Sequence, residues 1–159
     1  MALEIYSALT DLASTLSSSW SAAVSAKSAS VSTPTGFTVL EPGLNRRHHD
    51  AIPHVFIIPA PRGQRIPIVE EGTMPMSRWE LPVRIWIAIA DESGVVSTIQ
   101  ASAADHLQII DYILTHNRPS SSTEGGASRS AGFGSFERSD GSVIWGGYYD
   151  LTLTVRPSY

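Results

Sequence analysis

The sequence predicts an α+β fold: an antiparallel or mixed sheet of four to five strands, with two helices packed on one face and a protruding β-hairpin arm. Two segments, near residues 3–20 and 97–117, repeat apolar side chains every three to four positions, which is typical of amphipathic helices. In the strand predicted at residues 79–91, every second residue from Trp79 to Ile89 is apolar, and this strict alternation is typical of a half-buried strand. Two helices on one sheet face give a two-layer α+β architecture.

Length and composition favour one domain that spans residues 1–159. The chain is 42% hydrophobic and 16% charged, so it can bury a core. Its formal net charge of −4 argues against general nucleic-acid binding, because proteins of that class usually carry a basic excess. It contains no cysteine, which excludes disulfides, thiolate nucleophiles and cysteine-ligated metals.

The first helix predicted by the sequence begins near residue 3. Glu4 and Asp11 lie within it and no basic residue precedes its apolar part, so we expect a folded helix and not a signal peptide. No uncharged apolar run approaches the roughly 18 residues of a membrane span. We therefore expect a soluble protein that is made in the cytoplasm. The predicted buried stripe consists of Ile5, Leu9, Leu12, Leu16 and Trp20.

Two predicted strands and a predicted arm follow a serine-rich stretch at residues 14–32. Residues 37–43 predict a short strand that stops at a Pro-Gly pair. Residues 54–60, "HVFIIPA", predict a central strand, since both of its faces are apolar. Residues of about 60–76 contain several prolines and glycines, and they predict the protruding hairpin arm.

The strand predicted at residues 79–91 is unusually long. At the usual rise it would span about 43 Å. A compact chain of this size has a diameter of roughly 40 Å. The strand therefore runs the full width of the domain or extends beyond it. Pro82 lacks an N–H group, so pairing fails on one side there, which suits an edge or a strand that leaves the sheet.

The C-terminal third begins with the second predicted helix, which opens on a Ser97-x-x-Gln100 capping box. Residues of about 118–134 are rich in glycine and serine and lack apolar periodicity, so they predict a mobile loop. A hairpin about Asp140-Gly141, a bulge at Gly146-Gly147 and a last strand complete the predicted chain.

The segment "RRHHDAIPH", residues 46–54, is the strongest candidate for a chemical site. His48, His49, Asp50 and His54 are possible metal ligands, and a small metal-dependent hydrolase is one alternative function. Neighbouring strand residues point to opposite faces, however, and no H-E-x-x-H spacing occurs. We favour a solvated connector, and we expect no enzyme activity, no metal and no cofactor.

Five other residues are candidates for contacts between subunits. Arg84 and Trp86 lie on the strand face opposite the core, and both residue types are enriched at interface hot spots. A local cation–π or stacking pair is the alternative for these two. Arg62 and Arg65 on the arm and Arg129 in the Gly/Ser loop are candidates by position, with plain solvated charge as the alternative for each.

The order of these segments resembles that of the tail terminator proteins of long-tailed bacteriophages, the minor tail proteins that close the tail tube below the head. The likeness is one of order and length and contains no diagnostic motif. The serine-rich stretch and the Gly/Ser loop depart from the most compact members. The matching segments are "LEIYSALTDLASTL", "HVFIIPA", "RWELPVRIWIAIAD", "STIQASAADHLQIIDYILTHN" and "GGYYDLTLTVRPSY".

The resemblance implies a hexameric ring in the neck of the virion. One face of the ring would meet the tail tube protein, and the other would meet the head connector or stopper protein. The role would be structural, in virus assembly, with DNA passing through the ring, no sequence-specific nucleic-acid contact and no membrane partner. Another neck ring, such as a head-completion or stopper protein, is the nearest alternative.

Overall fold

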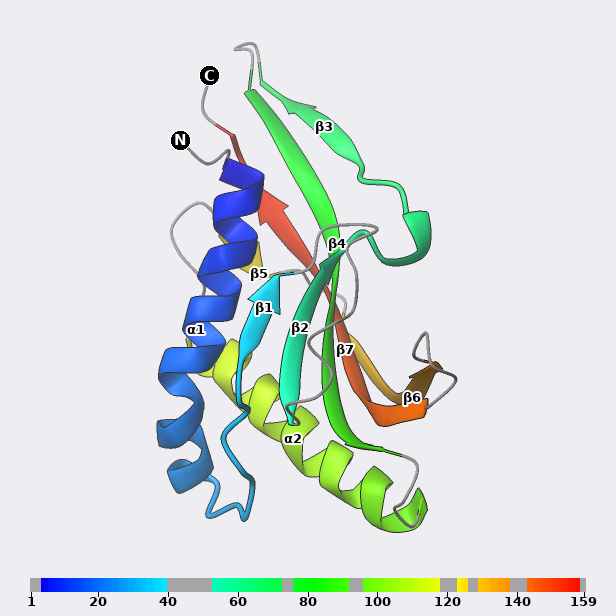
Figure 1. Ribbon diagram of the computed structural model, residues 1–159. Coiled ribbons are helices and arrows are strands. Elements are labelled where there is room, and N and C mark those ends of the chain that lie inside the picture. The colour runs from blue at the N-terminus through cyan, green and yellow to red at the C-terminus, as the bar shows by residue number, and fades with distance from the viewer. Residues whose placement is uncertain are drawn as a thin grey trace.

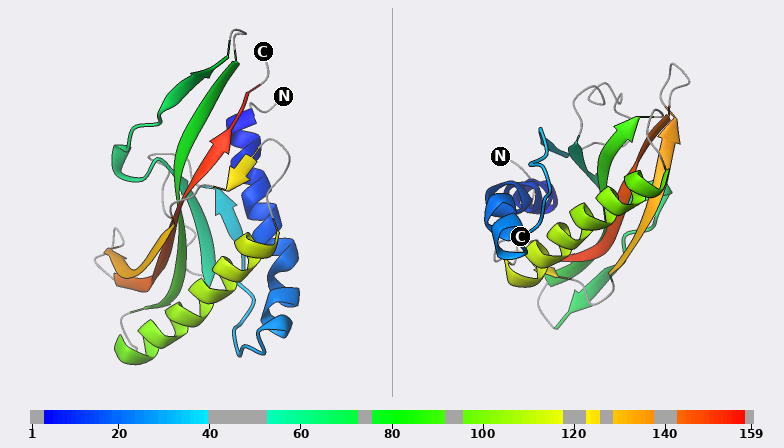
Figure 2. Two further views of the ribbon diagram at one scale, coloured as in Figure 1. Left: turned by 180° about the vertical axis from the view of Figure 1, so that it is seen from behind. Right: turned by 90° about the horizontal axis from the view of Figure 1, so that it is seen from below.

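The computed structural model describes residues 4–39, 53–72, 76–91, 96–117, 123–125, 129–137 and 143–157. It contains two helices and one mixed sheet, which confirms the predicted α+β class. α1 (Glu4–Ala26) and α2 (Val96–His116) pack on the same face of the sheet (Figures 1 and 2). Neither helix is long and apolar enough to span a membrane.

The sheet runs in the order β1–β2–β4–β7–β5, and in addition β3 pairs with β4 and β6 pairs with β7. The central antiparallel pair is formed by β4 (Met76–Asp91) and β7 (Val143–Val155). β1 (Phe37–Val39) runs parallel to β2 (His54–Pro59). A 3-10 turn, η2, precedes β3. η2 spans Pro61–Gly63 and β3 spans Ile68–Glu71. The two remaining strands are β5 (Thr123–Gly125) and β6 (Ser130–Glu137).

The main core lies between the two helices and the sheet. The odd-numbered side chains of β4 and β7 face the helices, as the alternation of both strands predicts. The apolar stripes of α1 and α2 pack against them, and these side chains are almost completely buried. The strand residues in this core include Leu81, Val83, Ile85, Ile87, Leu151, Leu153 and Val155, and the helix residues include Leu12, Leu16, Trp20, Ile110 and Ile113.

The opposite face of the sheet carries a second, smaller apolar cluster. It consists of Phe56, Trp86, Ala88 and Ile144. β2 contributes to both clusters, because Val55 and Ile57 belong to the main core. The prediction of a central strand buried on both faces is therefore confirmed.

The sheet has seven strands, more than the four to five that the sequence predicts, because strands occupy part of the predicted Gly/Ser loop. Aromatic rings take the place of the missing side chains of two β6 glycines. A Cβ at Gly134 would lie 3.4 Å from the Trp86 ring, and one at Gly132 would overlap Tyr148. The prediction of a loop was therefore wrong for residues 123–125 and 130–134.

The arm predicted at about residues 60–76 corresponds to η2, β3 and the first residue of β4. β3 and the start of β4 form an antiparallel hairpin, with Ile68 opposite Trp79. Trp79 also pairs with Val155 of β7, so only residues 76–78 of β4 lie beyond the end of the central pair. A long free arm is therefore not confirmed, although the hairpin forms one end of the molecule (Figure 1).

The predicted bulge lies opposite the Gly-Gly pair and not in it. Ala88 pairs with Gly146 and Ala90 pairs with Trp145, so Ile89 of β4 is the extra residue. A Cβ at Gly146 would overlap the carbonyl oxygen of Ile87. Glycine therefore allows the two central strands to approach closely beside the bulge.

Candidate subunit interface

Arg84 and Trp86 lie on the sheet face opposite the helices, as predicted, but both are engaged within the chain. Nε and Nη2 of Arg84 donate to the two carboxylate oxygens of Asp150 on β7, at 2.8 and 2.9 Å. The guanidinium lies 4.3 Å from the centre of the Tyr148 ring. The hydrogen bond to Asp150 is the main reason that the pKa of Arg84 is raised. The local cation–π alternative therefore describes Arg84, with Tyr148 as its ring.

Trp86 belongs to the second apolar cluster and is only 7% exposed. Its ring extends from β4 towards β6, where it lies beside Gly134. A side chain this buried has little surface to offer a partner. The interface role predicted for Trp86 is therefore not supported by its position.

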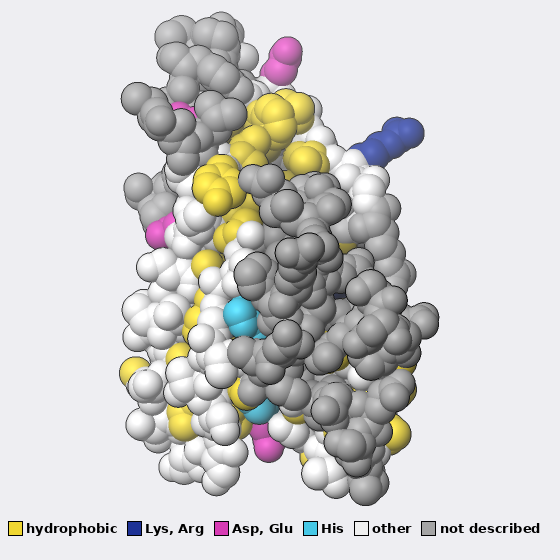
Figure 3. Space-filling model, viewed as in Figure 1, with side chains coloured by type: hydrophobic (Ala, Val, Ile, Leu, Met, Phe, Trp, Pro, Cys, Tyr) yellow, Lys and Arg dark blue, Asp and Glu magenta, His cyan; other side chains and the backbone are white. Residues whose placement is uncertain are grey.

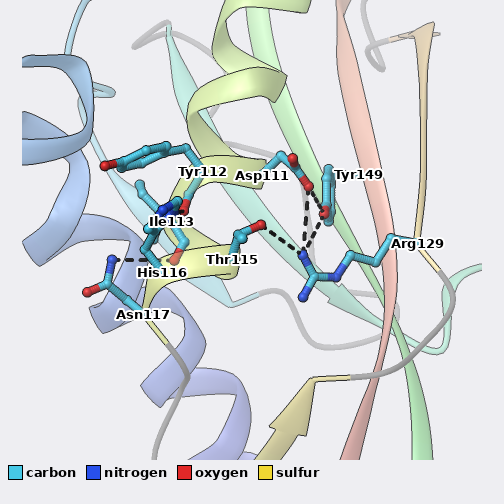
Figure 4. A network of polar contacts seen from close by, with 8 residues as sticks. All are labelled: Asp111, Tyr112, Ile113, Thr115, His116, Asn117, Arg129 and Tyr149. Carbon is cyan, nitrogen blue, oxygen red and sulfur yellow. Dashed lines mark hydrogen bonds and ion pairs between the residues drawn. The ribbon is translucent and has the colours of Figure 1, made fainter. Parts of the chain in front are cut away.

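Arg129 directly precedes β6 and joins a polar network with α2 and β7 (Figure 4). Its Nη1 lies 3.4 Å from Thr115 Oγ1, 3.4 Å from the Tyr149 hydroxyl and 3.7 Å from Asp111 Oδ1. The Tyr149 hydroxyl donates to Asp111 at 2.6 Å. Burial, aided by that hydrogen bond, raises the pKa of Tyr149 to about 12, so the hydroxyl keeps its proton at neutral pH. The network fixes the start of β6 against α2.

The two arginines predicted on the arm lie in η2 and just before β3. Arg62 is part of η2, and its side chain is outside the described part of the chain. Arg65 is exposed and lines a shallow depression of about 310 Å³ on the sheet face opposite the helices. The other lining residues are Gln64, Pro67, Glu80, Pro82 and Thr152.

The depression does not have the character of a substrate pocket. Small-molecule sites usually enclose most of their ligand and are lined mainly by apolar side chains. Here charged, polar and proline side chains surround a hollow that opens widely to solvent. This surface suits contact with another protein better than it suits an enclosed reaction.

Of the four predicted metal ligands, only His54 lies within the described residues. His48, His49 and Asp50 lie outside the described residues. His54 is buried in β2, where its Nε2 lies 2.8 Å from Thr38 Oγ1 and its ring stacks on Phe56. Over the described ranges, no three His, Asp or Glu residues are grouped so that they could hold a metal ion.

Sequence reasoning missed an apolar surface on the hairpin. Ile68 of β3 is 53% exposed and Val69 is 38% exposed. Ile68 lies opposite Trp79 on the helix side of the sheet, and Ile66 shares that side by the two-residue period. We call Ile66, Ile68 and Trp79 the hairpin patch. Figure 3 shows hydrophobic side chains gathered at this end of the molecule, over the hairpin and beside the start of α1.

Four outer strands, β1, β3, β5 and β6, each pair with one neighbour only among the described residues. In the part of the chain that the structure describes, β6 pairs only with β7, and β3 pairs only with β4. β6, "SAGFGSFE", contains no proline and no basic residue, and its Phe133 is 48% exposed. Proteins commonly protect edge strands with lysine, proline or bulges. β6 is therefore well suited to pair with a further strand.

No protein-family model matches this chain, and no curated protein sequence is significantly similar to it. Its function must therefore be inferred from residues and geometry. Among the described residues, the open strand edges, the apolar hairpin patch and the wide depression are surfaces of the kind that other protein chains can cover.

Proposed function

We propose that the chain is a structural protein of a bacteriophage virion: a tail terminator subunit whose hexameric ring caps the tail tube and joins it to the head connector. The observation that carries the proposal is the edge of the eight-residue strand β6, which is open among the described residues, in a chain that also exposes apolar side chains on its hairpin. Surfaces that are open in this way among the described residues are suited to contact with other chains.

A closed ring would cover these surfaces in every copy. When one patch of a subunit binds a different patch of the next subunit, repetition of the contact gives a ring if the rotation closes. β3 and β6 are different strands, and they pair with different members of the central strand pair. This arrangement supports a head-to-tail contact of that kind.

The order of elements also supports the proposal. An N-terminal amphipathic helix, a central antiparallel pair with a hairpin, a second helix on the same face and a final strand agree with what the tail terminator resemblance implies. The proposed partners are sibling copies, the tail tube protein and the head connector or stopper protein. Arg62 and Arg65 stay candidates for those contacts.

Reconstitution with the tail tube protein tests this function. Native mass spectrometry of the purified chain should give a closed oligomer, and electron microscopy should show rings. When the chain is added to growing tubes of a tail tube protein from the same genome, rings should cap the tube ends and elongation should stop. A ring that binds the connector but never the tube would identify a stopper or head-completion protein instead. A monomer that leaves tube growth unchanged would refute both assignments.

A further inference from the structure

We infer that β3 of one copy adds to the open edge of β6 in a neighbouring copy, antiparallel and with Ile68 opposite Phe133. The inference rests on the proposed ring and names the contact that would hold it together. Both strands have an open edge among the described residues. Each also carries one of the most exposed large apolar side chains of that part of the chain, Ile68 at 53% and Phe133 at 48%.

The two side chains lie on the same side of their sheets. Ile68 lies opposite Trp79, which packs against the main core. Phe133 lies opposite Gly147, where an added Cβ would meet Leu107 of α2. Residues directly opposite each other on antiparallel strands share a face. Pairing Ile68 with Phe133 therefore keeps the helix sides of neighbouring copies continuous, as a ring of equivalent subunits requires.

The remaining positions of this register are compatible with close pairing. Val69 falls opposite Gly132, and the Tyr148 ring already lies beside that glycine. Val69 is 38% exposed in the single chain, so it would gain an aromatic neighbour. Pro67 falls opposite Gly134. Its carbonyl oxygen already accepts a hydrogen bond from the backbone N–H of Glu80 on β4, so its missing N–H group faces β4 and not the added strand.

Charge decides the direction of the added strand. In the antiparallel arrangement Glu70 falls opposite Ala131, two positions from Arg129 and on the same face. Long side chains reach such diagonal neighbours. The Arg129 side chain is 31% exposed and is held at this place by Tyr149, Thr115 and the Asp111 carboxylate, which lies 3.7 Å away (Figure 4). If the added strand ran parallel to β6 with Ile68 still opposite Phe133, Glu70 would lie further from Arg129.

The alternative partner for the open edge of β6 is the β6 strand of another copy. Two such strands, antiparallel about Phe133, would form a twofold dimer. That dimer would leave β3 and the hairpin patch exposed in every copy. Pairing of β3 with β6 covers both edges by one type of contact, so the geometry favours it.

Cysteine cross-linking tests the contact, since the chain has no cysteine of its own. Ile68→Cys and Phe133→Cys proteins, purified separately with tags of different size, are mixed and oxidised gently. Cβ atoms of directly opposite residues lie about 4.5–5.5 Å apart, close to disulfide reach. We expect a product that contains one chain of each kind. The control replaces Ile68→Cys by Tyr6→Cys, at a side chain on α1 that is 44% exposed, and should give only background.

The double variant Ile68→Cys/Phe133→Cys extends the test. Each copy would bond two neighbours, so a denaturing gel should show a ladder of linked chains. A ring that forms without the mixed product would overturn this contact and leave the proposed ring standing. Preferential linking of Phe133→Cys to itself would establish the twofold dimer instead. In the last outcome, circular dichroism shows that the variants fold, but the variants and the native chain all remain monomeric and no cross-link forms. This result would overturn both the contact and the proposed ring.

Discussion

At the scale of single residues, the core encloses two side-chain nitrogens that have no hydrogen-bond partner among the described residues, His106 Nε2 and Trp20 Nε1. His106 Nδ1 lies 2.6 Å from the carbonyl oxygen of Ser102. Because a carbonyl oxygen only accepts, Nδ1 carries the hydrogen and Nε2 is bare in the neutral ring. The Trp20 ring, with its centre 6.1 Å from that of His106, offers a donor and no acceptor. A second proton on His106 would therefore be poorly accommodated.

We accordingly expect the protein to lose stability as the pH falls below 6.5. Burial lowers the pKa of His106 from its ordinary value of 6.5, against the opposing effects of the Ser102 carbonyl and Asp105. The unfolded chain then takes up a proton that the folded chain does not. The free energy of unfolding should fall by up to about 1.4 kcal/mol per pH unit until the folded-state pKa is reached. Urea unfolding at a series of pH values measures this slope.

His106→Leu removes the titrating group from the same apolar site and should flatten this part of the profile. His116→Leu is the matched control, because His116 is an exposed histidine on the same helix. If His106→Leu and the native chain lost stability in parallel between pH 6.5 and 5, another group would be responsible.

The alternation of the long strand was sufficient to predict that Arg84 and Trp86 share the face opposite the core. It could not predict their partners. Asp150, which binds Arg84, lies 66 residues further along the chain and meets it only through the register of β4 and β7. Trp86 is covered by packing that depends on Gly134 of β6, in a segment that the sequence predicts as loop. Partners that are distant in sequence leave no local pattern.

At the scale of elements, the central pair of strands depends on Gly146. A Cβ there would overlap the carbonyl oxygen of Ile87, a backbone atom that cannot rotate away. We expect Gly146→Ala to lower the free energy of unfolding by about 3 kcal/mol or more, because overpacking must be relieved by movement of β4. The matched control is Gly134→Ala, whose Cβ would lie 3.4 Å from the Trp86 ring. It should cost less than about 1 kcal/mol. Equal costs in urea unfolding would show that strand proximity at Gly146 is not limiting.

The elements that could be predicted are those with a local period. Both helices and β4 repeat their apolar residues over many positions, so their type follows from side-chain direction alone. β6 lacks that repeat, because glycines occupy positions where neighbouring rings supply the packing. The hairpin patch was missed because side-chain exposure depends on neighbouring strands. Whether Ile68 is exposed depends on which strands end beside it, and no local pattern encodes that.

At the scale of the whole molecule, assembly and stability are linked. A partner that binds only the folded chain stabilises it in proportion to the logarithm of its concentration. If copies bind one another through Ile68, the thermal unfolding midpoint of the native chain should rise with protein concentration. Ile68→Lys should abolish this rise, since burying one isoleucine side chain contributes about 1.5–3 kcal/mol and a lysine forfeits it. Scanning calorimetry over a wide concentration range measures the midpoint.

The comparison with Tyr6→Lys separates a contact between copies from a general effect of a surface lysine. Tyr6 and Ile68 are both large apolar side chains that are about half exposed, at 44% and 53%. Tyr6 lies on α1 and belongs to neither strand edge. In dilute solution both variants should unfold near the native midpoint, because neither side chain is buried in the single chain. Only Ile68→Lys should stay at that midpoint when concentrated. If its midpoint rose as that of Tyr6→Lys does, the hairpin patch would not be a contact between copies.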